Sequence, residues 1–496
     1  MELLQGLASG FSLALQPMNL LYALVGCIVG TITGILPGIG PLGAMAILLS
    51  FTLYMDATGA MIFFSGIYYG AMYGGSTTSI LLNIPGEAAT VVTCIDGLKM
   101  AQKGRAGAAL SISAVGSFVA GTISILGLML ATPFLGSAAL RFGPPEFFAI
   151  GMCGLVLLVK LSEGSVIKST IMILVGMALY TVGIDYLSGT LRFTLGIEQL
   201  SQGIDFLPVA MGLFGIAEVL ETACSPDEPV VAKKVKFREL LPSRQEWHRS
   251  VNPVLRGSAM GFLIGLIPGP SPVISTFVSY ITEKKLSKHP EEFGLGAIEG
   301  VAGPEAANNA AVGGAYVPLL ALGIPFTPAM AMVLGALLLH NITPGPNLIQ
   351  DKPDLFWGVI ASMYIGNFML LVLNLPMVNI FVNILRMPRH ILLPVIVMLC
   401  LVGVYSVNSS LLDLLIMGLF GLVGFALKRV GFPPAPLILA MVISPMLENS
   451  LRQALLISGG NLGELVFRPI CIVLYLIAAA IIVVPIWLGR KRSRSL

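Results

Sequence analysis

Long unbroken apolar runs, such as Ile470 to Leu488 and Ile391 to Val407, constrain this chain more than any other feature. Hydrophobic residues make up 56% of its 496 residues and charged residues 11%, whereas soluble domains carry about 25% charged residues. So few charges cannot cover a surface that faces water. In lipid every backbone polar group needs an internal partner, which leaves helices and closed barrels. A barrel requires alternating strands of about ten residues, so the unbroken runs predict an all-α, polytopic protein of the lipid bilayer.

The lengths of the apolar segments predict how many of them cross the bilayer. A spanning helix takes about 20 apolar residues, and by this criterion the chain has about 10–12 transmembrane helices. Shorter apolar segments cluster within 37–55, 267–283 and 310–340. We predict that these segments are re-entrant or broken helices, because they are too short to span.

Basic residues divide the chain into parts. The most polar stretch lies near the middle and contains Lys233, Arg238 and Arg249, and a second basic run ends the chain. Basic segments favour the cytoplasmic side, so we expect the linker and the C-terminus to be cytoplasmic; a solvated linker and an anchoring tail is the simpler interpretation. The net charge of +3 does not indicate a nucleic-acid partner. The predicted parts are an amphipathic N-terminal segment 1–16, a first membrane repeat 17–222, a linker 223–252, a second membrane repeat 253–489 and a basic tail 490–496.

A Gly/Pro motif occurs twice. The segment Val25 to Pro41 reads VGCIVGTITGILPGIGP, and Arg256 to Pro272 reads RGSAMGFLIGLIPGPSP. Six Gly or Pro residues of each copy match at identical spacing, which is hard to obtain by chance. A later pair follows each copy, since Gly74-Gly75 and Gly313-Gly314 both precede an Ile-Pro dipeptide. We therefore infer that the chain is built from two related halves.

The motif predicts a helix, a break and a second helix. Gly at every fourth position lets another helix approach closely. The dipeptides Pro37-Gly38 and Pro268-Gly269 then end the first helix, because Pro excludes the preceding residue from helical geometry and Gly accepts a positive φ. Such breaks are tolerated at membrane depth only where they line a cavity, and paired breaks indicate a transporter's binding site. A kinked structural helix is the alternative.

The basic loops alternate between the halves. In the first half the loop after the break, 54–58, has no basic residue, whereas the later loop contains Lys99, Lys103 and Arg105. In the second half the first loop, 283–292, contains three lysines and the later loop, 347–354, contains one. Under the positive-inside rule this pattern gives the halves opposite orientations. The sequence therefore predicts an inverted repeat.

Hydroxyl and amide residues follow the first break. Ser76, Thr77 and Thr78 lie in a run of hydroxyl residues after two glycines, and Asn83 precedes Ile84-Pro85-Gly86. Hydroxyl groups donate hydrogen bonds to anionic oxygens and offer lone pairs to Na⁺. We predict that these residues bind substrate or ion; hydroxyl groups that bond their own helix backbone are the alternative.

The second half carries a different polar set. Asn308 and Asn309 have both donor and acceptor atoms for the same two tasks. Glu305 is an acidic residue beside apolar sequence, so it must be paired, protonated or in water, and a helix cap is its alternative role. Thr343 lies in a later Pro/Gly-rich helix stop, 340–346. We include these four residues in the predicted substrate and ion site.

These motifs resemble the large membrane (permease) subunit of the tripartite tricarboxylate transporter family. The resemblance rests on Gly30–Pro41, Tyr69–Gly86, Gly303–Asn309 with Gly313-Gly314, and His340–Pro346. It implies a bacterial inner-membrane permease with two partners, a small four-helix membrane subunit and a periplasmic solute-binding protein. It also implies citrate-like or other carboxylate substrates, transport driven by a cation gradient, usually Na⁺ with H⁺ as the alternative, and no cofactor. Phe326 departs from the pattern, because a small Gly-like residue is expected after Ile324-Pro325.

Our hypothesis is a cation-coupled carboxylate importer whose substrate and ion bind near the midplane, between the two breaks. A passive channel and a membrane-embedded enzyme are the rival classes. A membrane metalloenzyme needs clustered His, Asp or Glu, as in H-E-x-x-H, whereas the four histidines here are far apart. Accumulation against a gradient would separate a carrier from a channel.

Overall fold

The structure is a computed structural model that describes residues 2–36, 40–83, 85–161, 165–185, 188–224, 240–376, 380, 389–476 and 478–479. Three predicted features fall on other residues. The break residues Pro37 and Gly38, half of the linker 223–252 and the basic tail 490–496 lie outside the described residues.

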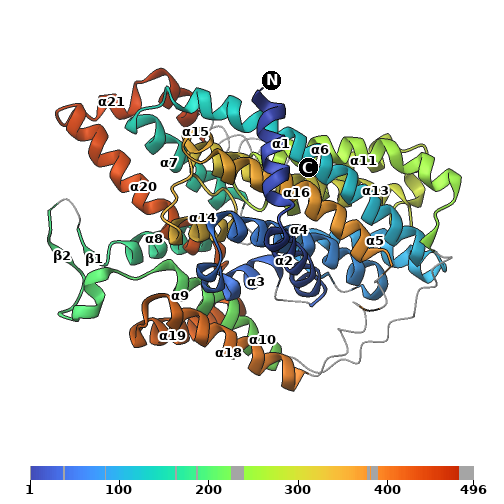
Figure 1. The fold of residues 1–496 in the computed structure, drawn as a ribbon, viewed down its shortest axis with the longest axis horizontal. Coiled ribbons are helices and arrows are strands. Elements are labelled where there is room, and N and C mark those ends of the chain that lie inside the picture. The colour runs from blue at the N-terminus through green and yellow to red at the C-terminus, as the bar shows by residue number, and fades with distance from the viewer. Residues whose placement is uncertain are drawn as a thin grey trace, which may run out of the picture.

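The described chain is helical apart from one small hairpin, which confirms the all-α prediction. Strands β1 (Gly183–Ile184) and β2 (Leu191–Arg192) pair antiparallel, with Gly183 opposite Arg192, and project from the left edge of Figure 1. The hairpin was not predicted, because its strands are too short to give a pattern. The first-half helices are α1 (Glu2–Ala14), α2 (Pro17–Ile35), α3 (Gly40–Leu48), η1 (Ser50–Tyr54), α4 (Ala57–Leu82), η2 (Ala88–Thr90), α5 (Val91–Gln102), α6 (Ala106–Ala139), α7 (Pro144–Leu161), α8 (Val166–Tyr180), η3 (Glu198–Gln202), α9 (Phe206–Ala210), η4 (Met211–Ile216) and α10 (Ala217–Cys224). The second-half helices are α11 (Arg244–Gly265), α12 (Ser271–Leu286), η6 (Pro290–Glu292), α13 (Glu299–Leu322), α14 (Pro328–Leu339), α15 (Leu348–Asp351), α16 (Pro353–Asn374), α18 (Arg389–Asn408), α19 (Leu411–Arg429), α20 (Ala435–Ile457) and α21 (Gly463–Val466).

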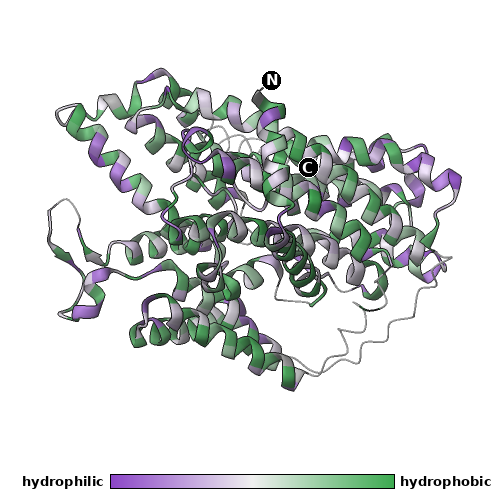
Figure 2. Cartoon of the chain, viewed as in Figure 1, coloured by the Kyte–Doolittle hydropathy of each residue, from purple (hydrophilic) through white to green (hydrophobic). Residues whose placement is uncertain are grey.

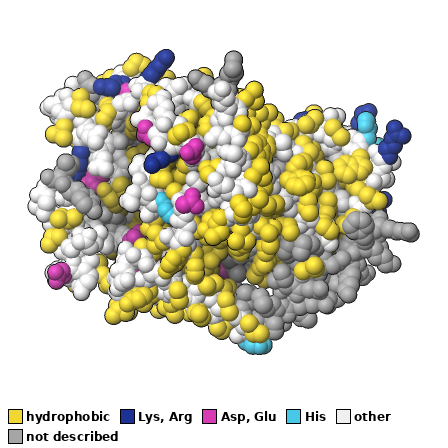
Figure 3. Space-filling view, viewed as in Figure 1, with side chains coloured by type: hydrophobic (Ala, Val, Ile, Leu, Met, Phe, Trp, Pro, Cys, Tyr) yellow, Lys and Arg dark blue, Asp and Glu magenta, His cyan; other side chains and the backbone are white. Residues whose placement is uncertain are grey.

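Five of the described helical segments are long and apolar enough to cross a membrane, against about 10–12 predicted from segment lengths. Hydrophobic residues run along most helices in Figure 2, and on the face in Figure 3 hydrophobic side chains far outnumber charged ones. These features fit a multi-pass membrane protein. The five segments are Pro17–Ile35, Ala106–Ala139, Phe206–Cys224, Pro353–Asn374 and Leu411–Arg429.

Two helices outside that set form the centre of the molecule. All residues of α13, and those of α4 from Thr58 to Ile80, are buried. Helix α2 packs along α4 and α11 packs along α13, while α6 covers α13 and α16 covers α4 (Figure 1). The central helices are rich in Gly, Ala, Ser and Thr, so other helices can approach them closely. They are therefore protein-facing rather than lipid-facing.

The regularly spaced glycines make the predicted close contacts in both halves. A Cβ built on Gly30 of α2 would lie 2.3 Å from the Ile67 carbonyl oxygen of α4. The matching Gly261 of α11 would place a Cβ 2.2 Å from the Ala307 carbonyl oxygen of α13. No side chain fits at either crossing, so the duplicated motif produces the same helix pair, α2 with α4 and α11 with α13.

The second-half break has the predicted form. Helix α11 ends at Gly265, α12 begins at Ser271, and Gly269 between them has a φ of 128°. The Gly269 N–H donates to the Phe326 carbonyl oxygen at 2.9 Å, which joins this break to the one after α13. Phe326, the departure from the family pattern, therefore contributes its backbone to the break. In the first half α2 ends at Ile35 and α3 begins at Gly40.

One predicted boundary is wrong. The cluster 310–340 was expected to contain only short re-entrant or broken helices, but its first part, 310–322, is the C-terminal half of α13, which begins at Glu299. The polar residues Glu305, Asn308 and Asn309 hid the helix, because they interrupt the apolar run. Their side chains make hydrogen bonds to other elements, which allows them to lie inside a buried helix.

Candidate functional site

Glu305 is the centre of a buried polar cluster. Its side chain is 1% exposed and lies in the N-terminal half of α13. The carboxylate accepts hydrogen bonds from Ser76 on α4, Thr93 on α5 and Ser113 on α6, the last at 3.2 Å. Three first-half helices and one second-half helix therefore meet at this carboxylate. The alternative role of a helix cap is wrong, because Glu305 lies inside α13 and contacts other helices.

The Ser76 hydroxyl beside Glu305 has two possible acceptors for its one hydrogen. The Ser76 hydroxyl lies within hydrogen-bonding distance of the Glu305 carboxylate and also 3.0 Å from the Met72 carbonyl oxygen. A serine hydroxyl has one hydrogen and two lone pairs, so it can donate to one of these acceptors at a time. A proton or cation on Glu305 would remove that competition, since the Ser76 hydrogen could then stay with Met72.

Asn308 and Asn309 lie three and four residues after Glu305, so they share its face of α13. The Asn308 amide nitrogen donates to the Glu87 carboxylate at 3.2 Å, and the Asn309 amide nitrogen donates to the Ser117 hydroxyl at 2.7 Å. Both asparagines are fully buried, and their amide oxygens have no hydrogen-bond partner among the described residues. Two acceptor atoms are thus left available beside a carboxylate.

The remaining predicted residues lie elsewhere. Thr78 bonds the Gly75 carbonyl oxygen of its own helix at 3.1 Å, which is the alternative interpretation of the hydroxyl run. Thr77 is also buried on α4. Asn83 is exposed and ends α4 in a left-handed conformation, with a φ of 60°. Thr343 is exposed in the loop after α14.

The two described break residues are placed apart from the acidic cluster. Pro268 and Gly269 are buried between α11 and α12 and contact the break after α13 through Phe326. The cluster therefore contains Ser76, Glu305, Asn308 and Asn309, and the break forms a second polar region. Pro37 and Gly38 are outside the described residues.

Sequence reasoning missed several members of the cluster. Glu87, Thr93 and Ser117 were not singled out, although each hydrogen-bonds Glu305, Asn308 or Asn309. Thr93 and Ser117 carry no signal, because single hydroxyl residues occur throughout membrane helices. Glu87 carried a signal in the sequence, since it is an acidic residue directly after the Pro85-Gly86 break.

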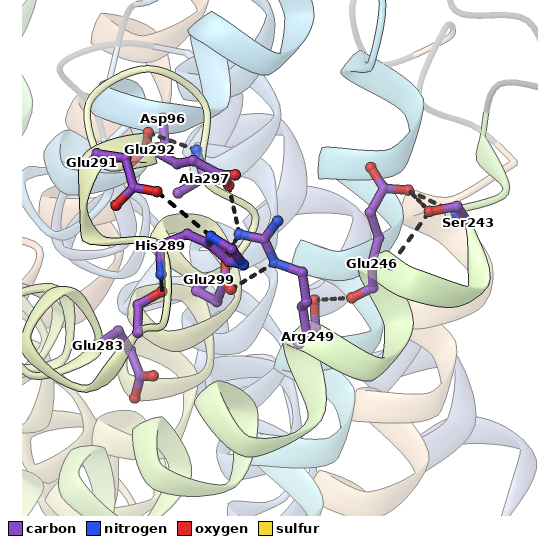
Figure 4. A network of polar contacts seen from close by, with 12 residues as sticks. Asp96, Ser243, Glu246, Arg249, Glu283, His289, Glu291, Glu292, Ala297 and Glu299 are labelled. Carbon is purple, nitrogen blue, oxygen red and sulfur yellow. Dashed lines mark hydrogen bonds and ion pairs between the residues drawn. The ribbon is translucent and has the colours of Figure 1, made fainter.

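Other carboxylates of the described chain are held differently. Figure 4 shows Arg249 between Glu292 and Glu299, with nitrogen–oxygen distances of 2.6 Å and 2.7 Å. Glu283 is paired with Arg256. Asp96 accepts three backbone N–H groups, at 2.7–2.9 Å, from the loop before α13. Each of these groups has a cationic or N–H partner, as buried charges require.

Within the described part of the chain, Glu305 has neither kind of partner. Its carboxylate contacts hydroxyl groups, and among the described residues no lysine or arginine is fully buried. Its acidic neighbour is Glu87, which is partly exposed. The cluster can therefore bind a cation or a proton but would repel an anionic carboxylate.

Comparisons with known proteins find one matching family and two similar proteins. A family model described as the tripartite tricarboxylate transporter TctA family matches residues 20–439. An uncharacterised 52.8 kDa protein in the TAR-I ttuC' 3' region of Agrobacterium vitis is 47% identical over 495 residues, covering 100% of this chain and 98% of that protein. An uncharacterised protein in the TAR-II ttuC' 3' region of the same organism is 50% identical over 210 residues, covering 42% of this chain and 87% of that protein. No solved structure matches the chain.

Proposed function

The chain belongs to the tripartite tricarboxylate transporter TctA family, and from this premise we propose that it imports tricarboxylates or related carboxylates by cation-coupled secondary transport. Family membership makes it a multi-pass membrane component of a tripartite transporter and a permease rather than an enzyme. The coupling ion in our proposal is Na⁺, with H⁺ as the alternative. The partners are a small four-helix membrane subunit and a periplasmic solute-binding protein that delivers the substrate.

The observation that carries this proposal is the exchange of contacts between the halves. Asn83 and Gly323, the left-handed residues that end α4 and α13, occupy matching places. When α4 and α13 are aligned at these two residues, Ser65 corresponds to Glu305 and Ser76 corresponds to Tyr316. Ser76 bonds Glu305, and in the matching pair Tyr316 lies 3.0 Å from Ser65.

A second pair of contacts exchanges in the same way. Glu87 bonds Asn308, and at the matching positions Thr327 contacts Tyr68. Two halves related by a two-fold axis produce such exchanged pairs. This supports the inverted repeat and a binding region at the interface of the halves, where transporters place substrate and ion.

The basic loops support the orientation. Arg105 after α5 pairs with Glu246 at the start of α11, and Gly296, in the loop after α12, packs against Lys99. The basic loops of both halves therefore meet at one end of the molecule. We propose that this end faces the cytoplasm, together with the linker and the C-terminus.

The substrate would bind at the breaks rather than beside Glu305. The N-terminal end of a helix at a break presents the positive end of a helix dipole, which favours anions. In the described residues α12 begins at Ser271, two residues after Gly269. A carboxylate substrate there would avoid the repulsion of Glu305 and Glu87.

Uptake into vesicles tests the proposed function. Membrane vesicles that contain this chain and its two partners should accumulate a radiolabelled carboxylate above the external concentration when an inward Na⁺ gradient is imposed. Collapse of the gradient should release the accumulated substrate. Equilibration without accumulation would mean a passive channel and would contradict the proposal.

A further inference from the structure

Glu305 has no cationic partner among the described residues. Its side chain is 1% exposed, and its hydrogen-bond partners there are the hydroxyl groups of Ser76, Thr93 and Ser113. An isolated carboxylate in an apolar interior is so costly that it takes up a proton or a counter-ion. The other fully buried glutamates of the described chain, Glu146, Glu283 and Glu299, each have an arginine within 4 Å.

Two uncharged oxygen atoms without partners share the helix face of the Glu305 carboxylate. The amide oxygens of Asn308 and Asn309 are buried, lack partners among the described residues and lie on the Glu305 face of α13. Carboxylate, amide and hydroxyl oxygens are the ligands that hard metal cations prefer. A proton on Glu305 would leave both amide oxygens unpaired, which costs free energy in a buried site. A metal cation would use them.

We propose that Glu305, Asn308 and Asn309, with the Ser76 hydroxyl, form a binding site for one Na⁺. A single carboxylate ligand suits a monovalent ion. Glu305 supplies that carboxylate, because Glu87 accepts a hydrogen bond from the Asn308 amide nitrogen at 3.2 Å instead. This inference rests on the proposed function, since it locates the coupling ion. It separates that ion from the substrate, because the acidic cluster repels a carboxylate.

The site also connects the halves. Glu305 is on α13 of the second half, and its partners Ser76 and Thr93 are on α4 and α5 of the first half. Without the cation, the Glu305 charge at this contact would be unbalanced, and its nearby acidic group, Glu87 of the first half, would add to the repulsion when ionised. A bound ion therefore holds the two halves together here, and its loss favours their separation.

Only one of the two matching places is acidic. The first pair is Glu305 of the second half with Ser76 of the first half. In the matching pair, Ser65 takes the place of Glu305 and Tyr316 takes the place of Ser76, and these two neutral hydroxyl groups lie 3.0 Å apart. Both members of that pair are buried, as Glu305 and Ser76 are. The neutral pair has no charge to hold a cation, so of the two matching places only the one at Glu305 is a candidate site. Ser65→Ala is accordingly a matched control.

Thermal unfolding of the purified full-length chain in detergent tests the site. We expect saturating NaCl to raise the Tm of the wild type by about 2–4 °C over choline chloride or KCl at equal ionic strength, because a ligand that binds the folded state stabilises it. Ser65→Ala should show the same rise and Glu305→Gln none. No Na⁺ effect in the wild type, or an equal effect in Glu305→Gln, would overturn the proposal.

A second variant covers the case in which Glu305→Gln does not fold. Asn308→Ala with Asn309→Ala keeps the carboxylate and removes two ligands, so the Na⁺ concentration for half the Tm rise should increase at least about 10-fold. An unchanged midpoint would overturn the proposal. If Glu305→Gln keeps Na⁺-driven carboxylate uptake, the proposed Na⁺ site is wrong and the proposed function stands. If Glu305→Gln loses the Na⁺ effect on Tm but the wild type accumulates no carboxylate, the Na⁺ site stands and the proposed function is wrong.

Discussion

The pairs Ser76–Glu305 and Ser65–Tyr316 occupy matching places in the two halves, yet they differ in charge. Both pairs join α4 to α13, and both are buried. The two places therefore share their packing and differ in their chemistry. Where the exchanged contact is neutral, the hydroxyl groups satisfy each other, whereas the acidic contact leaves a charge that needs a counter-ion.

Ion-paired glutamates sharpen this comparison. Glu299 is also on α13 and also buried, but Arg249 binds its carboxylate in a two-pronged contact, at 2.7 Å and 2.8 Å (Figure 4). That pair needs no further ion. Glu299 therefore has a structural role, while Glu305 is the buried glutamate that can exchange its counter-ion.

The largest expected effect comes from removing the partner of Glu299. Arg249→Ala should lower the free energy of unfolding by about 3–5 kcal/mol, because it leaves a buried carboxylate without its cation. Arg249→Lys keeps the charge and should cost less. The measurement is chemical or thermal unfolding in detergent. Equal stability of Arg249→Ala and the wild type would mean that the Glu299 carboxylate, like that of Glu305, does not need an arginine partner.

Removing the charge of Glu305 should act on transport rather than on folding. We expect Glu305→Gln to lower Na⁺-driven carboxylate uptake at least about 100-fold, since it removes the charged ligand of a cation site. The amount of protein in the membrane should stay similar, because the amide keeps the shape and can bond the same hydroxyl groups. Uptake within a few-fold of the wild type would show that the cluster is structural.

The matching glycine crossings should respond alike. Gly30→Ala and Gly261→Ala place a methyl group 2.3 Å and 2.2 Å from a carbonyl oxygen of the neighbouring helix. Each should cost about 1–3 kcal/mol of stability. Gly418→Ala on α19 is the control, because nothing lies within 4 Å of its Cβ position. A large difference between the two crossings would argue against equivalent packing in the halves.

The neutral pair should tolerate change. Tyr316→Phe removes one hydrogen bond to Ser65, which is worth about 0.5–1.5 kcal/mol of stability. Uptake and its Na⁺ dependence should stay within about three-fold of the wild type, since no ion ligand is lost. Loss of Na⁺ dependence in this variant would mean that both matching places bind ions.

The smallest expected effect is a pH dependence outside the membrane. In the loop before α13, the hydrogen bond from Arg249 lowers the pKa of Glu292 below its ordinary value of 4.5. A lowered pKa stabilises the fold above pH 4.5, and that contribution is lost as the pH falls through the lower, folded-state value. Because the Glu292 side chain is 43% exposed, the effect should stay under about 1 kcal/mol. Glu292→Gln should abolish it in unfolding measured at pH 3 to 6.

Much of this architecture could be predicted from the sequence, because Gly and Pro act locally. Gly30 and Gly261 predicted the close helix pairs, and Pro268-Gly269 predicted the break between α11 and α12. Helix α13 was cut short, because Glu305 and Asn308 read as the end of an apolar segment. Their partners lie on other helices, and a sequence pattern does not contain that information.

The candidate site was predictable only in part for the same reason. Asn308 and Asn309 were found because polar residues in apolar sequence stand out. Thr93 and Ser113 reach Glu305 from α5 and α6 across the fold, and no local pattern marks them. The contrast between a charged and a neutral pair appeared only once the halves could be compared in three dimensions.

Equilibrium binding of radioactive ²²Na⁺ to the purified full-length chain tests the central claim most directly. The wild type and Tyr316→Phe should each bind one Na⁺ per chain, and Glu305→Gln should bind none at the concentration that saturates the wild type. Binding retained by Glu305→Gln, or lost in Tyr316→Phe, would contradict the assignment of the ion to the acidic member of the two matching pairs.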